Sequence, residues 1–167
     1  MSTFESCREI LLLPCNCFSF RIVRLLLNWN PEIIDARDPN GFTPLHCACQ
    51  RNVLKVVKVF EVQQNLEKVL EAQTQDSNTP LHIACMNGDK SLDIVNFLIE
   101  KNANVHAKNK NGKTPMHISA SGGYLQLTNT LLKKGADVNV QDAEGHTPLI
   151  LAVICDHKSV VSLLLPK

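Results

Sequence analysis

The chain is poor in aromatic residues and carries almost no net charge. It contains one Trp, one Tyr and six Phe among 167 residues, which argues against the stacked aromatic surfaces that bind single-stranded nucleic acid. Its 17 basic residues nearly balance 16 acidic ones, so no overall field attracts nucleic acid or an anionic membrane. We therefore expect a soluble domain with a core of Leu, Ile, Val and Ala, and neither a nucleic-acid nor a membrane partner.

The apolar segment near the N-terminus has neither the length of a membrane span nor the flanks of a secretory leader. Residues 10–20, ILLLPCNCFSF, are interrupted by Pro14 and are shorter than the roughly 20 residues that a spanning helix needs. Glu5 and Glu9 precede this segment, where a secretory leader would carry basic residues. The seven cysteines are an odd number, and we expect reduced thiols. These observations predict a cytoplasmic protein, with the nucleus as an alternative location.

A Thr-Pro motif recurs four times at nearly constant spacing. It reads TPLH at 43–46, TPLH at 79–82, TPMH at 114–117 and TPLI at 147–150, so that its threonines are 36, 35 and 33 residues apart. Residues 114–140, TPMHISASGGYLQLTNTLLKKGADVNV, form a complete copy, with two short apolar-patterned helices and a closing loop. Thr suits the N-cap of the first helix, and Pro suits its first position, where no N–H is needed. A period near 33 residues indicates stacked repeats.

The repeated pattern resembles the ankyrin repeat over about residues 20–165. This resemblance implies an all-α solenoid of stacked helix-turn-helix units with β-hairpin-type loops, in about four to five repeats. It also implies that the His of each motif hydrogen-bonds around the Thr and fixes the turn. The structural motif residues are then Thr43, Pro44, His46, Thr79, Pro80, His82, Thr114, Pro115, His117, Thr147 and Pro148. Ile150 replaces His in the last motif, so we expect no such bond there.

The repeat pattern divides the chain into two parts. We expect residues 1–19 to form an N-terminal cap or irregular segment, and residues 20–167 to form the repeat domain. The domain is predicted to consist of a partial repeat at 20–37 and repeats at about 38–73, 74–108, 109–141 and 142–167, the last of them incomplete.

Two connections depart from the regular repeat. Helices are expected at 44–51 and 54–62, after which the connection 63–75 is longer than the usual closing loop and lacks its Gly-Ala-Asp-Val-Asn ending. Extra residues around Asp89 separate the two helices of the next repeat. Asn102 stands where Gly usually ends the second helix, so we expect it in the left-handed conformation.

The candidate chemical sites are each explained by the repeat. His46, His82 and His117 occupy one repeat position, so they should lie one repeat apart and not converge on one metal ion. The two cysteines of residues 47–49, CAC, point to different faces of a helix and should not bind a metal together. Residues 107–114, AKNKNGKT, lack the first Gly and the preceding strand of a phosphate-binding loop. With no nucleophile elbow and no converging carboxylate pair, we predict no enzyme activity, no cofactor and no metal.

The repeat pattern predicts a protein-binding surface on the hairpin tips and first helices, where side chains have no structural role. The predicted partner-binding residues are Asn40, Phe42, Gln50, Arg51, Asp76, Asn78, Met86, Asn87, Lys110, Asn111, Lys113, Ser121, Glu144, His146 and Ile154. Phe42, Met86 and Ile154 would be apolar anchors, or would pack against the adjacent tip. The six lysines from Lys101 to Lys134, with no acid among them, are either solvated surface or a site for an acidic partner. We expect a monomeric, non-catalytic scaffold that binds another protein.

Two narrower resemblances imply different partners. The connection 63–75 followed by TPLH resembles the long third-repeat connection of the inhibitor-of-κB (IκB) proteins, and residues 151–165, LAVICDHKSVVSLLL, resemble a later IκB repeat. This resemblance implies a constitutive inhibitor that sequesters a Rel-type transcription factor, because the sequence has no Asp-Ser-Gly phosphodegron before the repeats. Residues 144–152, EGHTPLILA, are similar to repeats of ankyrin-bearing transient-receptor channels, which implies a fragment of a longer protein.

Overall fold

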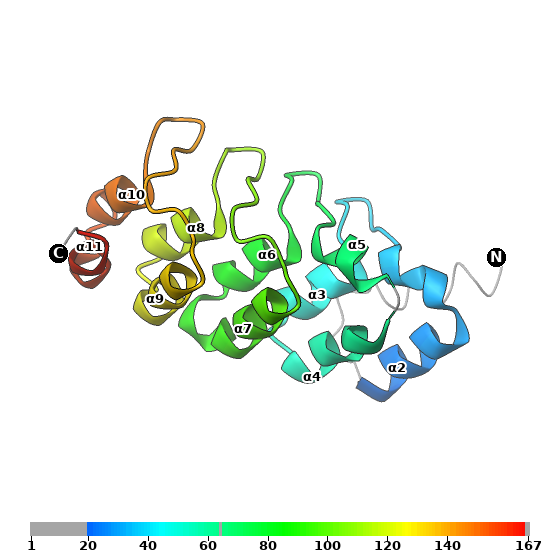
Figure 1. The fold of residues 1–167 in the computed structure, drawn as a ribbon. Helices are drawn as coiled ribbons and strands as arrows, with labels where there is room; N and C mark the ends of the chain where they lie inside the picture. Colours follow the sequence, from blue (N-terminus) through cyan, green and yellow to red (C-terminus); the bar gives the residue numbers. More distant parts are fainter. Residues whose placement is uncertain (1–19, 64, 166–167) are drawn as a thin grey trace.

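The protein is an all-α solenoid in the part that its computed structural model describes, residues 20–63 and 65–165 (Figure 1). These ranges contain ten α-helices, three 3₁₀ helices and no strand. Helix pairs stack in a row, and the loops between pairs project to one side of it. None of the described helices is long and apolar enough to cross a membrane. The predicted solenoid is confirmed, while the expected cap at residues 1–19 lies outside the described residues.

Each full repeat supplies a first helix near the projecting loops and a second helix on the opposite side (Figure 1). The first helices are α3 (Pro44–Gln50), α6 (Pro80–Met86), α8 (Pro115–Ser121) and α10 (Pro148–Ile154). The second helices are α2 (Phe20–Trp29), α4 (Leu54–Val57) with η2 (Lys58–Val62), α7 (Leu92–Glu100), α9 (Leu125–Lys133) and α11 (Lys158–Leu164). The connections contain η1 (Pro31–Asp35), α5 (Leu66–Leu70) and η3 (Gly88–Ser91). The first helices pack against one another in chain order, so the repeats form one continuous stack.

Left-handed residues separate the helices at equivalent positions. The first helix of each full repeat is followed by Asn52 (φ 56°), Gly88 (φ 74°), Gly123 (φ 70°) or Asp156 (φ 56°). Asn102 also has a positive φ, 69°, as its position after the second helix predicted. Gly and Asn adopt this conformation most readily, so these residues let two short helices lie back to back.

The core repeats one set of contacts along the stack. Small residues occupy the same position in the four first helices and are at most 1% exposed: Ala48, Ala84, Ser119 and Ala152. Larger residues at another shared position, Leu45, Leu81 and Met116, are 0% exposed. Small side chains allow close approach of neighbouring helices, and each buried Leu or Met contributes about 1.5–3 kcal/mol through loss of apolar surface to water. Neighbouring repeats therefore stabilise each other.

The irregular connection 63–75 was expected as a loop, but it contains α5. Leu66, Val69 and Leu70 have the i, i+3, i+4 spacing of one helix face, and Val69 and Leu70 are buried. This spacing is visible in the sequence, but the prediction followed the regular repeat, which has a loop here. Burial of these two side chains explains why the segment is helical.

Two other departures concern the second helices. The helix expected at 54–62 is divided, because α4 ends at Val57 and the tighter η2 continues to Val62. The extra residues around Asp89 form η3, and the Asp89 carboxylate accepts a hydrogen bond from the Leu127 N–H at 2.9 Å. The insertion thus caps the start of α9 in the following repeat.

The loops between repeats are tight hairpin turns without strand structure in the described residues. In the first turn the Asp38 carboxylate accepts hydrogen bonds from the N–H groups of Asn40 at 2.9 Å and Phe42 at 2.7 Å. Asn109 and Asp142 play the same role in later turns. Each of these three turns also contains a left-handed glycine: Gly41, Gly112 and Gly145.

One backbone hydrogen bond joins each turn to the next. The N–H groups of Gln75, Lys110 and Ala143 donate to the carbonyls of Asn40, Asp76 and Asn111, each at 2.9 Å. The first turn has Pro39 at the donor position, and proline has no N–H to leave unpaired. The four turns are therefore held in one row, which positions the side chains at their tips.

We expect Gly112→Ala to destabilise the protein more than Gly145→Ala. Both glycines have positive φ, 70° and 81°, so either substitution costs about 1 kcal/mol in backbone strain. A Cβ on Gly112 would also lie 2.7 Å from the backbone nitrogen of Ala143, whereas a Cβ on Gly145 would meet nothing within 4 Å. This overlap should cost roughly 1–2 kcal/mol more.

The free energy of unfolding, measured in urea for both variants, tests this expectation. Equal losses in the two variants would contradict the close contact between the third and fourth turns.

Candidate partner-binding groove

Three of the four Thr-Pro motifs are closed by a histidine within their own turn. The Thr43 N–H donates to Nδ1 of His46 at 3.2 Å, and the Thr43 Oγ1 lies 2.8 Å from the same nitrogen. The same contacts occur between Thr79 and His82 and between Thr114 and His117. These bonds satisfy backbone groups at the helix start that would otherwise lack a partner.

The same histidines join each repeat to the next. Their Nε2 atoms lie 3.0 Å from a backbone carbonyl of the following turn: Asn78 for His46, Lys113 for His82 and His146 for His117. Because Nδ1 accepts and a carbonyl can only accept, Nε2 carries the proton in the neutral ring. The side chain of Ile150 has no ring nitrogen. In this motif only the backbone N–H of Ile150 donates to the Thr147 Oγ1, at 3.3 Å. The row of histidine bonds thus ends at the fourth turn.

Burial keeps these imidazoles neutral. It lowers the pKa of His46 to about 4, and it also lowers the pKa of His82 and of His117. No group of three or more metal-binding side chains occurs in the described part of the chain. The histidines therefore hold the turns in place, and the surface that the turns display is the candidate site.

A groove of about 540 Å³ lies between the first two turns and the helices α3 and α6. Seven of the predicted partner-binding residues line it: Asn40, Phe42, Gln50, Asp76, Asn78, Met86 and Asn87. These residues come from two turns and two helices, and the structure brings them together around one hollow. We call this hollow the concave groove.

The concave groove has an apolar floor and a rim rich in amides. Phe42, Ile83 and Met86 supply the apolar surface, and Met86 is 47% exposed. Asn40 and Gln50 are exposed at the rim, where amide groups can bind a peptide backbone. Asp76 is the only charged side chain among its described lining residues. The groove therefore suits a neutral segment with an apolar side chain.

Two of the predicted lining residues are already engaged in the fold. Asn78 is only 9% exposed, and its Oδ1 accepts a hydrogen bond from Nδ2 of Asn109 at 3.0 Å. Asn87 donates from Nδ2 to the carbonyl of Cys49 at 2.8 Å. These amides shape the groove more than they offer groups to a partner.

The other predicted residues lie outside the concave groove. Arg51 is half-buried at the C-terminal end of α3, and Ser121 donates to the Ile118 carbonyl at 3.2 Å. Ile154, at the end of α10, is 63% exposed. The rest lie on the third and fourth turns: Lys110, Asn111, Lys113, Glu144 and His146. They continue the row of turns seen in Figure 1.

Sequence reasoning missed Thr74 and Ile83 as lining residues. Thr74 takes the place of Asp38 in the second turn, and its Oγ1 accepts a hydrogen bond from the Asn78 N–H at 3.2 Å. Ile83 occupies the position of Cys47 in the repeat and is only 5% exposed. The repeat alignment assigns both to structural positions, so it gives no signal that they also face the groove.

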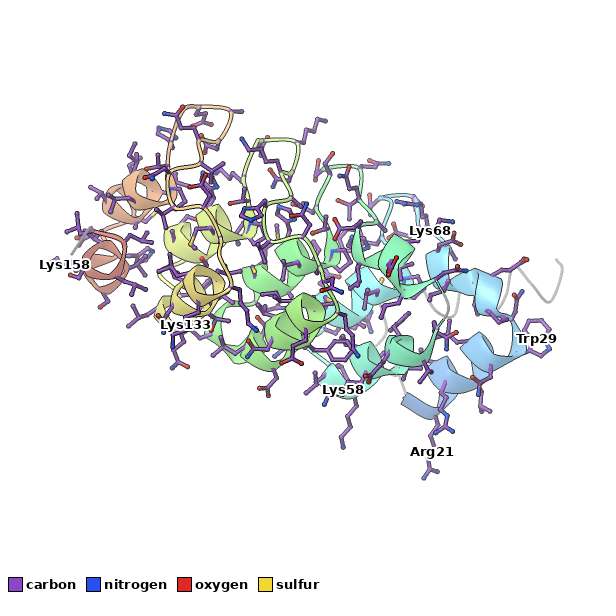
Figure 2. The ribbon with its side chains drawn as sticks, in the orientation of Figure 1. Arg21, Trp29, Lys58, Lys68, Lys133 and Lys158 are labelled. Carbon is purple, nitrogen blue, oxygen red and sulfur yellow. The ribbon has the colours of Figure 1, made fainter. Side chains whose placement is uncertain are left out.

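The six lysines between Lys101 and Lys134 do not form one patch. Lys101 pairs with Glu61 at 2.7 Å, and Lys108 donates to the Gln141 carbonyl at 2.9 Å. Lys133 lies at the end of α9, on the side away from the turns (Figure 2). Of the six lysines, Lys110 and Lys113 are the two at the tip of the third turn.

The turns, helices and groove define a helical repeat scaffold, and comparison with known proteins identifies its family. A family model described as ankyrin repeats, three copies, matches residues 11–109, 60–142 and 89–167. The chain belongs to the ankyrin-repeat family. Repeats of this kind form protein–protein interaction scaffolds, which is the broad function that the match assigns.

Several curated proteins contain similar segments. The chain is 37% identical over 98 residues to the probable 26S proteasome regulatory subunit p28 of Saccharomyces cerevisiae. The aligned segment covers 59% of this chain and 42% of that protein. It is 34% identical over 118 residues to the transient receptor potential cation channel subfamily A member 1 of Homo sapiens, in an alignment that covers 70% of this chain and 10% of the channel. It is 33% identical over 103 residues to the NAD-dependent deacetylase sir2B of Dictyostelium discoideum, which covers 58% of this chain and 13% of the deacetylase. The chain spans less than half the length of each relative.

We expect the free energy of unfolding of the parent chain to fall more steeply between pH 7 and pH 5 than that of the His46→Gln variant. The folded-state pKa of His46 is about 4, below its ordinary value of 6.5. Between these values the unfolded chain binds more protons, so the free energy of unfolding decreases as the pH falls. At pH 5 the titration of His46 alone lowers the free energy of unfolding by about 2 kcal/mol. The His46→Gln variant does not have this loss, because glutamine cannot titrate.

Urea unfolding at the two pH values measures the difference between the slopes. His106→Gln, at an exposed histidine, is the matched control and should keep the steep dependence. The same slope in the His46 variant and the parent chain would show that the buried imidazole does not control acid sensitivity.

Proposed function

We propose that the chain binds an extended segment of a partner protein in the concave groove and catalyses no reaction. The observation that carries this proposal is the convergence of seven predicted residues from two turns and two helices on one hollow. Exposed Met86 supplies an apolar contact, and the rim amides supply hydrogen-bond donors and acceptors. Aromatic and Met side chains surrounded by polar groups are typical of protein-binding surfaces.

The hydrogen bonds between turns support this role. Both walls of the concave groove are tied together, by the Gln75 N–H to the Asn40 carbonyl at 2.9 Å and by His46 to the Asn78 carbonyl at 3.0 Å. A surface that is already ordered loses less conformational entropy on binding. The groove can therefore bind a flexible segment without reorganising its own backbone.

Two observations bear on the narrower hypotheses about partners. The helix α5 gives the connection 63–75 a folded structure, which supports testing a Rel-type transcription factor, the partner implied by the IκB resemblance. The 34% identity to a channel over 70% of this chain supports the alternative of a repeat segment in a longer protein. We also propose a cytoplasmic location for the chain, with the nucleus as an alternative.

A selection from a displayed library of random 12-residue peptides tests the proposed function. Selected peptides should bind the chain, and Met86→Ala should weaken their binding about tenfold, as for a central apolar anchor. Leu125→Ala is the matched control, because Leu125 is similarly exposed (40%) but lies on α9, and it should have no effect.

Calorimetry with purified Rel-type dimers, on the same two variants, tests the narrower hypothesis. Binding that is weakened by Met86→Ala would support sequestration through the concave groove. No binding to any dimer would remove that hypothesis. If the Met86→Ala and Leu125→Ala variants bind the selected peptides equally well, the binding site lies outside the concave groove.

A further inference from the structure

A second hollow lies on the opposite side of the stack, between α2 and η2. It has a volume of about 390 Å³ and is lined by Arg24, Asn28, Lys58, Val59, Val62 and Gln63. We call it the α2–η2 groove. A neighbouring hollow of about 340 Å³ shares Asn28, Val62 and Gln63 with it and is also lined by Leu27, Pro31, Ile34 and Asn65. The groove lies away from the turns, on the side where Figure 2 shows Arg21 and Lys58.

The groove lies where the second repeat departs from the regular pattern. α4 has four residues and continues as the 3₁₀ helix η2, whereas α7 and α9 have nine residues each. A 3₁₀ helix is narrower than an α-helix and eclipses its side chains at i and i+3. The wall opposite α2 is therefore thinner here, and Val62 remains 80% exposed at the end of η2.

The charged side chains that line the groove in the described part of the chain are both basic. Arg24 and Lys58 are exposed, and neither forms an ion pair with another described residue. Arg21, also exposed, lies one turn before Arg24 on α2. Among the described residues that line the two hollows there is no acid.

The acid next to Lys58 on its own element is already paired. Glu61 bonds to Lys101 at 2.7 Å. Lys101 is the main cause that lowers the pKa of the Glu61 carboxyl, and Lys58 contributes less. The positive charge of Lys58 and Arg24 is therefore left largely uncompensated at the rim.

The groove also offers apolar and hydrogen-bonding surface. Val62 is 80% exposed, and Val59, which is 5% exposed, also lines the groove. Asn28 and Gln63 provide amide groups that can bind a peptide backbone. A ligand must therefore combine negative charge with an apolar side chain and a polar backbone.

We propose that the α2–η2 groove binds an acidic segment of a protein partner, with an apolar side chain against Val62 and carboxylates facing Arg24 and Lys58. A nucleic acid would require many phosphate contacts, and an anionic membrane is usually bound by clusters of four to eight basic residues. The two cations among the described lining residues, Arg24 and Lys58, are too few for either. The site is separate from the concave groove, so the two grooves can hold different segments.

Composition-restricted libraries of displayed 12-residue peptides test this inference. One library combines Asp and Glu with Leu, Phe and Ser, a second replaces the acids by Lys and Arg, and a third replaces them by Asn and Gln. We expect the acidic library to yield binders that the basic library does not. The double variant Arg24→Glu, Lys58→Glu should weaken these binders at least tenfold, and Val62→Ser should weaken them by a smaller factor.

The matched control is Lys133→Glu, Lys158→Glu, which changes the net charge equally at exposed residues of α9 and α11 (Figure 2). It should leave binding within about twofold, as should Met86→Ala, which probes the concave groove. Circular dichroism of each variant checks that the fold is kept.

Three outcomes would overturn the inference. In the first, the acidic library yields no binders. In the second, its binders bind the Arg24→Glu, Lys58→Glu variant as tightly as the parent chain. In the third, both double variants lose binding equally. Vesicles with phosphatidylserine and a single-stranded RNA, assayed in parallel, should not bind, and binding of either one through Arg24 and Lys58 would replace the proposed partner. Because Met86→Ala is measured separately, failure here is distinct from failure of the concave groove.

Discussion

The structure depends on the hydrogen bonds of three buried, neutral histidines. Each imidazole accepts a bond within its own Thr-Pro turn and lies in bonding distance of a carbonyl in the following turn. One side chain therefore fixes the start of a helix and the position of the next repeat. The backbone bonds between turns add a second tie at the tips. Since a solenoid has contacts only between neighbours, these ties hold the concave surface in shape.

Periodic features of the sequence predicted the periodic part of the structure. The Thr-Pro pairs predicted the starts of α3, α6, α8 and α10, because the chemistry of a helix N-terminus is local. The left-handed conformation of Asn102 followed from its repeat position. Seven residues of the concave groove could be named for the same reason, since the repeat determines which positions face outward. The burial of Asn78 could not be predicted, because it depends on Asn109 in the next turn.

The parts that the sequence did not predict depend on contacts between distant residues or on departures from the repeat. The helix α5 forms where the regular pattern has a loop, because Val69 and Leu70 become buried. The lysines between 101 and 134 form one run in sequence, but Lys101 pairs with Glu61, 40 residues away, and Lys108 bonds to the Gln141 carbonyl, 33 residues away. Charge patterning along the chain therefore could not show which of these lysines are engaged by distant residues.

The departures from the repeat change the surface of the stack. A regular array presents its variable side chains on turns and first helices, and its second helices mainly pack against each other. In the second repeat, the change from α4 to η2 opens a basic groove on the second-helix side, while the turns retain their hydrogen bonds. The two grooves differ in charge and lie on opposite sides of a rigid stack. A partner that carries a neutral apolar segment and an acidic segment could bind both, and linkage of two weak contacts raises affinity without any new contact.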